Sequence, residues 1–154
     1  MEGCVVWDDS KSLVLSKICV IIFMVLLLTV AILAPGIAGL LMYVSPHANA
    51  AGRAYFMATI YAGCVPAAIL LVYLYILLRR ISAGSVFVKA NVACLRHISW
   101  CCFAGAMICF VSALYYIPWL AFGDAAAFMG LIVRVIKNVF AKAVSLQDDS
   151  DLTI

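Results

Sequence analysis

The sequence contains seven cysteines, the residues with the widest choice of chemistry: Cys4, Cys19, Cys64, Cys94, Cys101, Cys102 and Cys109. A membrane thiol–quinone oxidoreductase needs a dithiol that can close into a disulfide, with one activated and accessible thiolate. Cys101 and Cys102 are adjacent, so on a helix their side chains point about 100° apart and a bond between them is strained. There is no C-x-x-C pair, and His47 and His97 lie far apart in the sequence. We therefore interpret the cysteines as small apolar packing residues and expect no metal and no other cofactor.

A second candidate site lies in the last long apolar segment, where Arg134 and Asn138 share a helix face beside Lys137. Ionisable groups inside a bilayer usually face the protein interior and mark the path of a ligand or an ion. One interpretation is therefore an intramembrane anion site, or a polar lock between Arg134 and Asn91. The other is the ordinary positively charged end of a membrane span, from which Arg134 reaches the headgroups.

The composition indicates whether the segments that carry these residues lie in water or in a lipid bilayer. Of the 154 residues, 68% are apolar and 11% are charged, against about 45–50% and about 25% in soluble domains. A soluble fold of this composition would expose a large apolar surface to water, whereas a bilayer removes that problem. The formal net charge of +3 is small and scattered, so we expect no direct nucleic-acid binding.

The apolar runs predict an all-α fold, an integral membrane four-helix bundle that forms a single transmembrane domain over residues 1–154. The first run, from Leu13 to Val44, is longer than the roughly 20 residues that a bilayer core requires. A cytoplasmic loop is expected at 79–92 and an acidic tail at 145–154, with Leu152 and Ile154 favouring a structured tail. The predicted spans are 13–44, 55–78, 93–117 and 119–144.

The positive charges predict the orientation of the spans. Nine of the ten Lys and Arg residues fall at or near the start of span one, between span two and the first turn of span three, or near the end of span four, and only Arg53 falls on the other side. Cytoplasmic loops are enriched in Lys and Arg, so both termini are expected in the cytoplasm.

Small residues recur every fourth position in span three, at Cys101, Gly105, Cys109 and Ala113. Helices in lipid associate through close backbone contact, which such a stripe allows. The stripe is interpreted either as intramolecular packing or as the face of a homo-oligomer.

The segment between spans two and three carries the clearest local signals. Gly84 suits the left-handed position that ends a helix, and the next helix is expected to start near Lys89, outside the membrane. Asn91 and Leu95 share one face of that helix, whereas Arg96 points elsewhere.

Two groups of residues form a recognisable pattern: Ile81, Gly84, Phe87, Asn91, Leu95, Arg96 and Ile98, and then Val139, Phe140, Ala143 and the ending Asp151-Leu152-Thr153-Ile154. This pattern resembles a bacterial membrane family called domain of unknown function 2975. Val88 departs from it, since Thr or Ser is expected there as a helix cap. The family has no established biochemical activity. Its members are often encoded beside a small helix-turn-helix regulator, which implies such a DNA-binding protein as a partner.

The hypothesis from the sequence is a non-enzymatic protein of the bacterial cytoplasmic membrane that acts through its cytoplasmic face as an interaction or regulatory partner. The expected contact residues are Phe87, Asn91, Leu95 and Arg96. The alternative is a small transporter, or an immunity protein against membrane-active peptides, with Arg134 at its centre.

Overall fold

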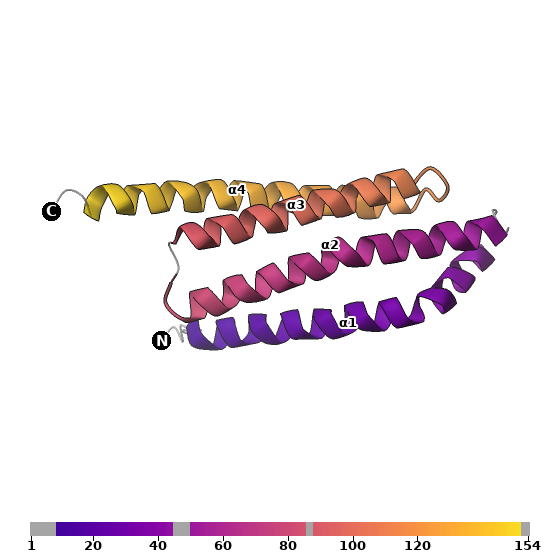
Figure 1. Ribbon diagram of the computed structural model, residues 1–154, viewed down its shortest axis with the longest axis horizontal. Coiled ribbons are helices and arrows are strands. Elements are labelled where there is room, and N and C mark those ends of the chain that lie inside the picture. Colours follow the sequence, from indigo (N-terminus) through magenta and orange to yellow (C-terminus); the bar gives the residue numbers. More distant parts are fainter. Residues whose placement is uncertain (1–8, 45–49, 86–87, 152–154) are drawn as a thin grey trace, which may run out of the picture.

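Four helices make up the protein in the computed structural model, which describes residues 9–44, 50–85 and 88–151. They are α1 (Asp9–Val44), α2 (Ala50–Ser82), α3 (Lys89–Ser112) and α4 (Trp119–Asp151). No strand occurs in the described residues. The prediction of an all-α, four-helix architecture is confirmed (Figure 1).

The helices run up and down in a row, and each packs against its neighbours in the chain. α2 packs on α1, α3 on α2 and α4 on α3, and the described parts of α1 make no backbone contact with α3 or α4. The start of α1, the end of α4 and the α2–α3 connection lie together at one end of the molecule (Figure 1). We call this the N/C end. The opposite end is where α1 ends, α2 begins and the α3–α4 connection lies.

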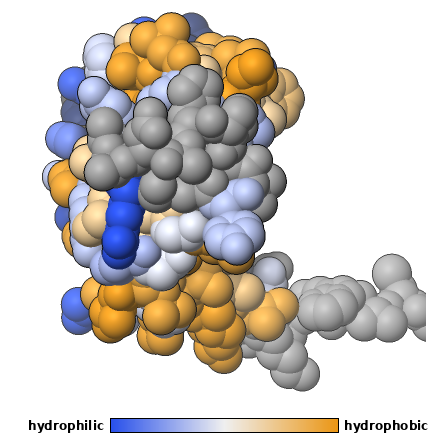
Figure 2. Space-filling model, turned by 90° about the vertical axis from the view of Figure 1, so that its right-hand side faces the viewer, coloured by the Kyte–Doolittle hydropathy of each residue, from blue (hydrophilic) through white to orange (hydrophobic). Residues whose placement is uncertain are grey.

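All four helices are long and apolar enough to cross a membrane. The qualifying segments are Ser12–Leu40, Gly52–Ser82, Lys89–Ser112 and Trp119–Gln147. Their outward-facing side chains are apolar, as in α1, where Leu28 is 65% and Ile32 is 77% exposed. Figure 2 looks onto the opposite end, where apolar side chains gather above and below a band of more hydrophilic residues. These are the properties of a multi-pass membrane protein.

The helix bounds differ from the predicted spans at several ends, because α1, α2 and α4 are longer than predicted and α3 ends earlier. The third helix starts at Lys89, as expected, but ends at Ser112 rather than at 117. The amides of Tyr115 and Tyr116 both bond to the carbonyl of Ser112, which turns the chain before Pro118. The fourth helix continues to Asp151, so most of the predicted acidic tail is helical.

Glycines of α4 allow its close approach to α3. A Cβ atom at Gly123 would lie 2.8 Å from the ring of Phe110, and one at Gly130 would lie 3.1 Å from the Cβ of Cys102. Beside Gly130, the Ser99 hydroxyl donates to the Gly130 carbonyl at 3.0 Å. This contact fixes the antiparallel register of the two helices.

Candidate functional site

The α2–α3 connection at the N/C end is built around a left-handed glycine. Gly84 has a φ of 82°, and its amide bonds to the Ile81 carbonyl at 3.0 Å, while the Ser85 amide bonds to the Arg80 carbonyl at 3.1 Å. These two bonds form a Schellman motif, which satisfies the last carbonyls of α2. The prediction that Gly84 takes the left-handed position is confirmed.

Asn91 ties the first turn of α3 to this connection. Its side-chain amide donates to the Ser85 carbonyl at 2.7 Å, and its backbone amide bonds to the Val88 carbonyl at 2.9 Å. Val88 is the extended N-cap residue and makes no side-chain capping bond. With 0% of its surface exposed, Asn91 positions the connection rather than lying on its surface.

Leu95 lies in the core beneath the connection. It is 6% exposed and clusters with the buried residues Leu77, Cys94 and Ile98. Phe140 of α4 packs against this cluster, so three helices meet here. The cluster around Leu95 thus holds α2, α3 and α4 together near the N/C end.

The four residues predicted to contact a partner therefore divide into three groups. Asn91 and Leu95 were expected on an accessible surface, and this expectation is corrected because both side chains are buried by the packing described above. Arg96 is exposed, and Phe87 lies outside the described residues. Partner binding at this end stays a prediction.

The last part of α4 presents apolar side chains that no other helix covers. Val139 is 62% and Leu146 is 60% exposed. A shallow groove runs along this face, and Asn138 and Lys142 form its polar part. Asn138, which the sequence grouped with Arg134, thus belongs to the exposed face of α4.

Arg134 lines a different, small pocket between α3 and α4. This pocket has a volume of about 150 Å³ and also holds Arg96 and Lys137. Ser99, Trp100 and Phe103 of α3 complete its walls. The structure thus brings together two arginines that the sequence analysis assigned to separate sites.

The small-residue stripe of α3 spreads over more than one surface. Cys109 faces α4, since its Cβ would lie 3.3 Å from a Cβ at Gly123, whereas nothing lies within 4 Å of a Cβ placed at Gly105. Cys101 lines a groove between α2 and α3, and Ala113 is the C-cap residue of α3. Six cysteines lie in the described residues and all are free. There, no three His, Cys, Asp or Glu side chains gather to hold a metal ion.

A protein-family model described as "Protein of unknown function (DUF2975)" matches residues 41–154, which is more than half of the chain. The chain belongs to the DUF2975 family. No curated protein and no solved structure gives a significant match. The resemblance drawn from the sequence is thereby confirmed. The matched range contains α2, α3 and α4 completely and only the end of α1.

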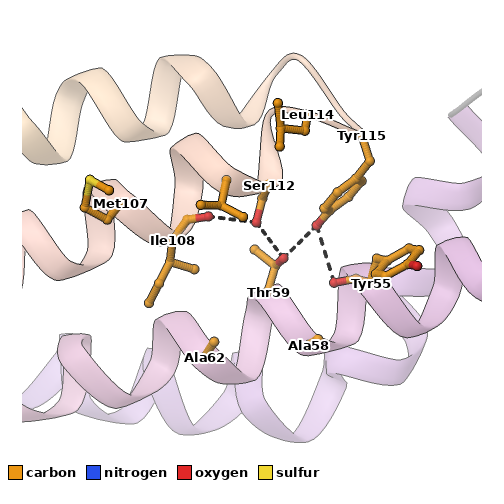
Figure 3. Close-up of a pocket in the computed structure, with 10 residues that line it drawn as sticks. Tyr55, Ala58, Thr59, Ala62, Met107, Ile108, Ser112, Leu114 and Tyr115 are labelled. Carbon is orange, nitrogen blue, oxygen red and sulfur yellow. Dashed lines mark hydrogen bonds between the residues drawn. The ribbon is translucent and has the colours of Figure 1, made fainter.

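At the opposite end, this DUF2975 protein has an apolar groove between α2 and α3 (Figure 3). Its volume is about 600 Å³. Ala58 and Ala62 of α2 line one side, and Met107, Ile108 and Leu114 lie across from them (Figure 3). The groove is open to the side, so in a bilayer it is accessible to lipid acyl chains.

A chain of hydroxyl groups crosses the wall of this groove and was missed by the sequence analysis. The Ser112 hydroxyl donates to the Ile108 carbonyl at 2.8 Å, so it accepts from Thr59, whose Oγ1 lies 2.7 Å away. Thr59 in turn accepts from the Tyr115 hydroxyl at 2.7 Å, because Thr59 is a closer acceptor for that proton than the Tyr55 carbonyl at 3.4 Å. Because each hydroxyl has one proton, this order satisfies all three groups. The signal for it was two polar residues, Thr59 and Ser112, inside apolar spans.

Proposed function

We propose that this DUF2975 protein is a non-enzymatic protein of the bacterial cytoplasmic membrane that binds a cytoplasmic partner protein at its N/C end. Both termini then lie in the cytoplasm, which the nine positive charges near this end support. A helix-turn-helix transcription regulator is the partner class that the family resemblance suggests. The protein would hold such a regulator at the membrane and away from DNA.

The length of α4 is the observation that carries this proposal. From the Ser99–Gly130 contact, α3 extends back to Lys89 and α4 extends forward to Asp151. At 1.5 Å per residue these distances are about 15 Å and about 31 Å. The end of α4 therefore projects beyond the start of α3 by about 16 Å, which is the length of about three helical turns. The projection is visible on the left of Figure 1.

The last part of α4, which ends in this projection, has the pattern of a peptide that docks into a groove. Val139 and Leu146 are two turns apart on one face, and both are exposed. Lys142 lies between them on the same face. An amphipathic helix of this kind binds an apolar groove through residues spaced by three, four and seven positions. The matching partner surface is an apolar groove with an acidic rim, which would face Lys142.

Site-specific photocrosslinking in native membranes tests the proposal. A photoreactive residue at position 146 is expected to form one discrete adduct with a soluble protein, whereas the same residue at Leu28, on the exposed side of α1, is expected to give none. The adduct should disappear when Val139→Asp removes the neighbouring apolar contact. Gln147→Ala, at an exposed position next to Leu146, is the matched control and should leave the adduct unchanged.

Two results would contradict partner binding by α4. Adducts at position 146 with lipid alone would place the face of Leu146 in the bilayer. Adducts with other copies of the chain alone would identify a homo-oligomer instead of a complex with a regulator.

A further inference from the structure

The small pocket between α3 and α4 collects three positive charges from two helices. Arg96 comes from α3, and Arg134 and Lys137 come from α4. None of the six residues that line the pocket is acidic. In the sequence of α4 the nearest acidic residues are Asp124 and Asp148, which lie about 15 Å or more away along the helix. The pocket is therefore strongly positive.

The register of the two helices explains why these cations meet. Ser99 of α3 and Gly130 of α4 are at the same level, because the Ser99 hydroxyl bonds to the Gly130 carbonyl. Arg96 is three residues before Ser99 and Arg134 is four residues after Gly130, so in antiparallel helices both lie toward the N/C end. The offsets are about 4.5 Å and about 6 Å. One level of the molecule thus carries both guanidinium groups.

That level corresponds to the headgroup region of a bilayer. Trp119 begins α4 and is of the residue type that anchors helices at a membrane interface. Arg134 and Lys137 follow it by about 22 Å and about 27 Å of helical rise. Long basic side chains reach several ångströms further, so their charges lie near the far boundary of a hydrocarbon core about 30 Å thick.

The walls of the pocket suit a lipid rather than a soluble metabolite. A volume of about 150 Å³ is well below the roughly 300–1,000 Å³ of small-molecule pockets, so it accommodates one charged group. Trp100, 65% exposed, and Phe103 lie on the side of Arg96 that faces the hydrocarbon. They offer an apolar surface to the acyl chains below such a group.

We propose that Arg96, Arg134 and Lys137 bind the phosphate of an acidic phospholipid headgroup. Arginine binds phosphate oxygens through paired, charge-assisted hydrogen bonds. A headgroup with a net negative charge is preferred over a zwitterionic one, because three cations and no acidic residue line the site. This site goes beyond the proposed partner binding and does not depend on it.

Native mass spectrometry of the full chain in detergent tests the site. Three probes are titrated separately: dioleoyl phosphatidylglycerol, dioleoyl phosphatidylethanolamine and inorganic phosphate. The unmodified protein is expected to retain phosphatidylglycerol in preference to the other two. Arg134→Gln and Arg96→Gln should each weaken that binding about tenfold, the effect of losing a charge-assisted bond. Arg134→Lys keeps the charge and should lose less than Arg134→Gln.

Arg79→Gln is the matched control, because Arg79 is an exposed cation at the N/C end that does not line the pocket. Circular dichroism of each variant checks that the helices are retained. Equal retention of the two lipids, or an equal loss in Arg79→Gln, would overturn the site. Binding of inorganic phosphate as strong as that of phosphatidylglycerol would overturn the lipid assignment and identify a soluble anion instead. No partner protein is present in this experiment, so its failure and that of the proposed function are separate results.

Discussion

Asn91 shows how a polar residue at the membrane boundary can have a positioning role. Its buried amide joins the first turn of α3 to the Ser85 carbonyl, just after the Schellman motif of α2. Close by, the Arg80 guanidinium donates to the sulfur of Cys94 at 3.6 Å. Side chains thus link the end of one helix to the start of the next. The orientation of α3, and with it of Arg96, depends on these links.

Asn91→Ala is expected to destabilise the protein by about 1 kcal/mol, because the hydrogen bond that the buried Asn91 side-chain amide donates to the Ser85 carbonyl is lost. Thermal unfolding of the purified protein in detergent, followed by circular dichroism, measures the change. Asn138→Ala is the control, since Asn138 is an exposed asparagine near the same end. Equal melting temperatures for the two variants would show that the Asn91 hydrogen bond contributes no stability.

At the scale of the elements, the contact between α3 and α4 depends on glycines of α4. Gly123 faces Phe110 and Cys109, and Gly130 faces Cys102. In lipid the hydrophobic effect does not drive helices together. The strength of their association therefore depends on how closely the two backbones pack. Gly105, the glycine of the α3 stripe, differs from the two glycines of α4, because nothing lies within 4 Å of a Cβ atom placed on it.

Gly123→Ala and Gly105→Ala are therefore expected to change stability in opposite directions. The first should destabilise by about 1–3 kcal/mol, because the new methyl group overlaps the Phe110 ring and forces the helices apart. The second should stabilise by up to about 1 kcal/mol, the helix-propensity gain of alanine over glycine. Unfolding by titration with a denaturing detergent compares them. A loss of stability in Gly105→Ala similar to that in Gly123→Ala would mean that Gly105 is also packed.

At the scale of the whole molecule, the helices form an open row rather than a closed ring. α1 packs on α2, and its described part makes no backbone contact with α3 or α4. Apolar side chains consequently remain exposed along the outer faces of the helices, as Leu28 and Ile32 do in α1. The bilayer is the natural solvent for these faces. An even number of spans also places both termini on one side.

Cysteine labelling tests which side that is. In a variant without the native cysteines, Arg53→Cys at the opposite end should react with a membrane-impermeant maleimide in intact cells. Ser85→Cys at the N/C end should react only after the cells are permeabilised, because the proposed orientation, based on the positive charges, places this end in the cytoplasm. Both positions are exposed in the structure. The reverse pattern would place the N/C end, and the proposed partner site, outside the cytoplasm.

The sequence by itself determined the features that depend on local chemistry and on length. Apolar runs longer than a bilayer is thick predicted the four helices, and one glycine without a Cβ predicted the left-handed end of α2 at Gly84. The start of α3 at Lys89 followed from the same turn. These features need no information about neighbouring helices, since each is decided within a few residues or by the thickness of the membrane.

Only the tertiary structure decided which residues meet. Helical periodicity places residues on a common face but does not say whether that face meets lipid, water or another helix. In a protein with apolar residues on every side, hydrophobicity gives no contrast to decide it. The register of α3 and α4, set by Ser99 and Gly130, therefore had to be seen before Arg96 and Arg134 could be placed in one pocket. The same packing buried Asn91, which the sequence had placed on the surface.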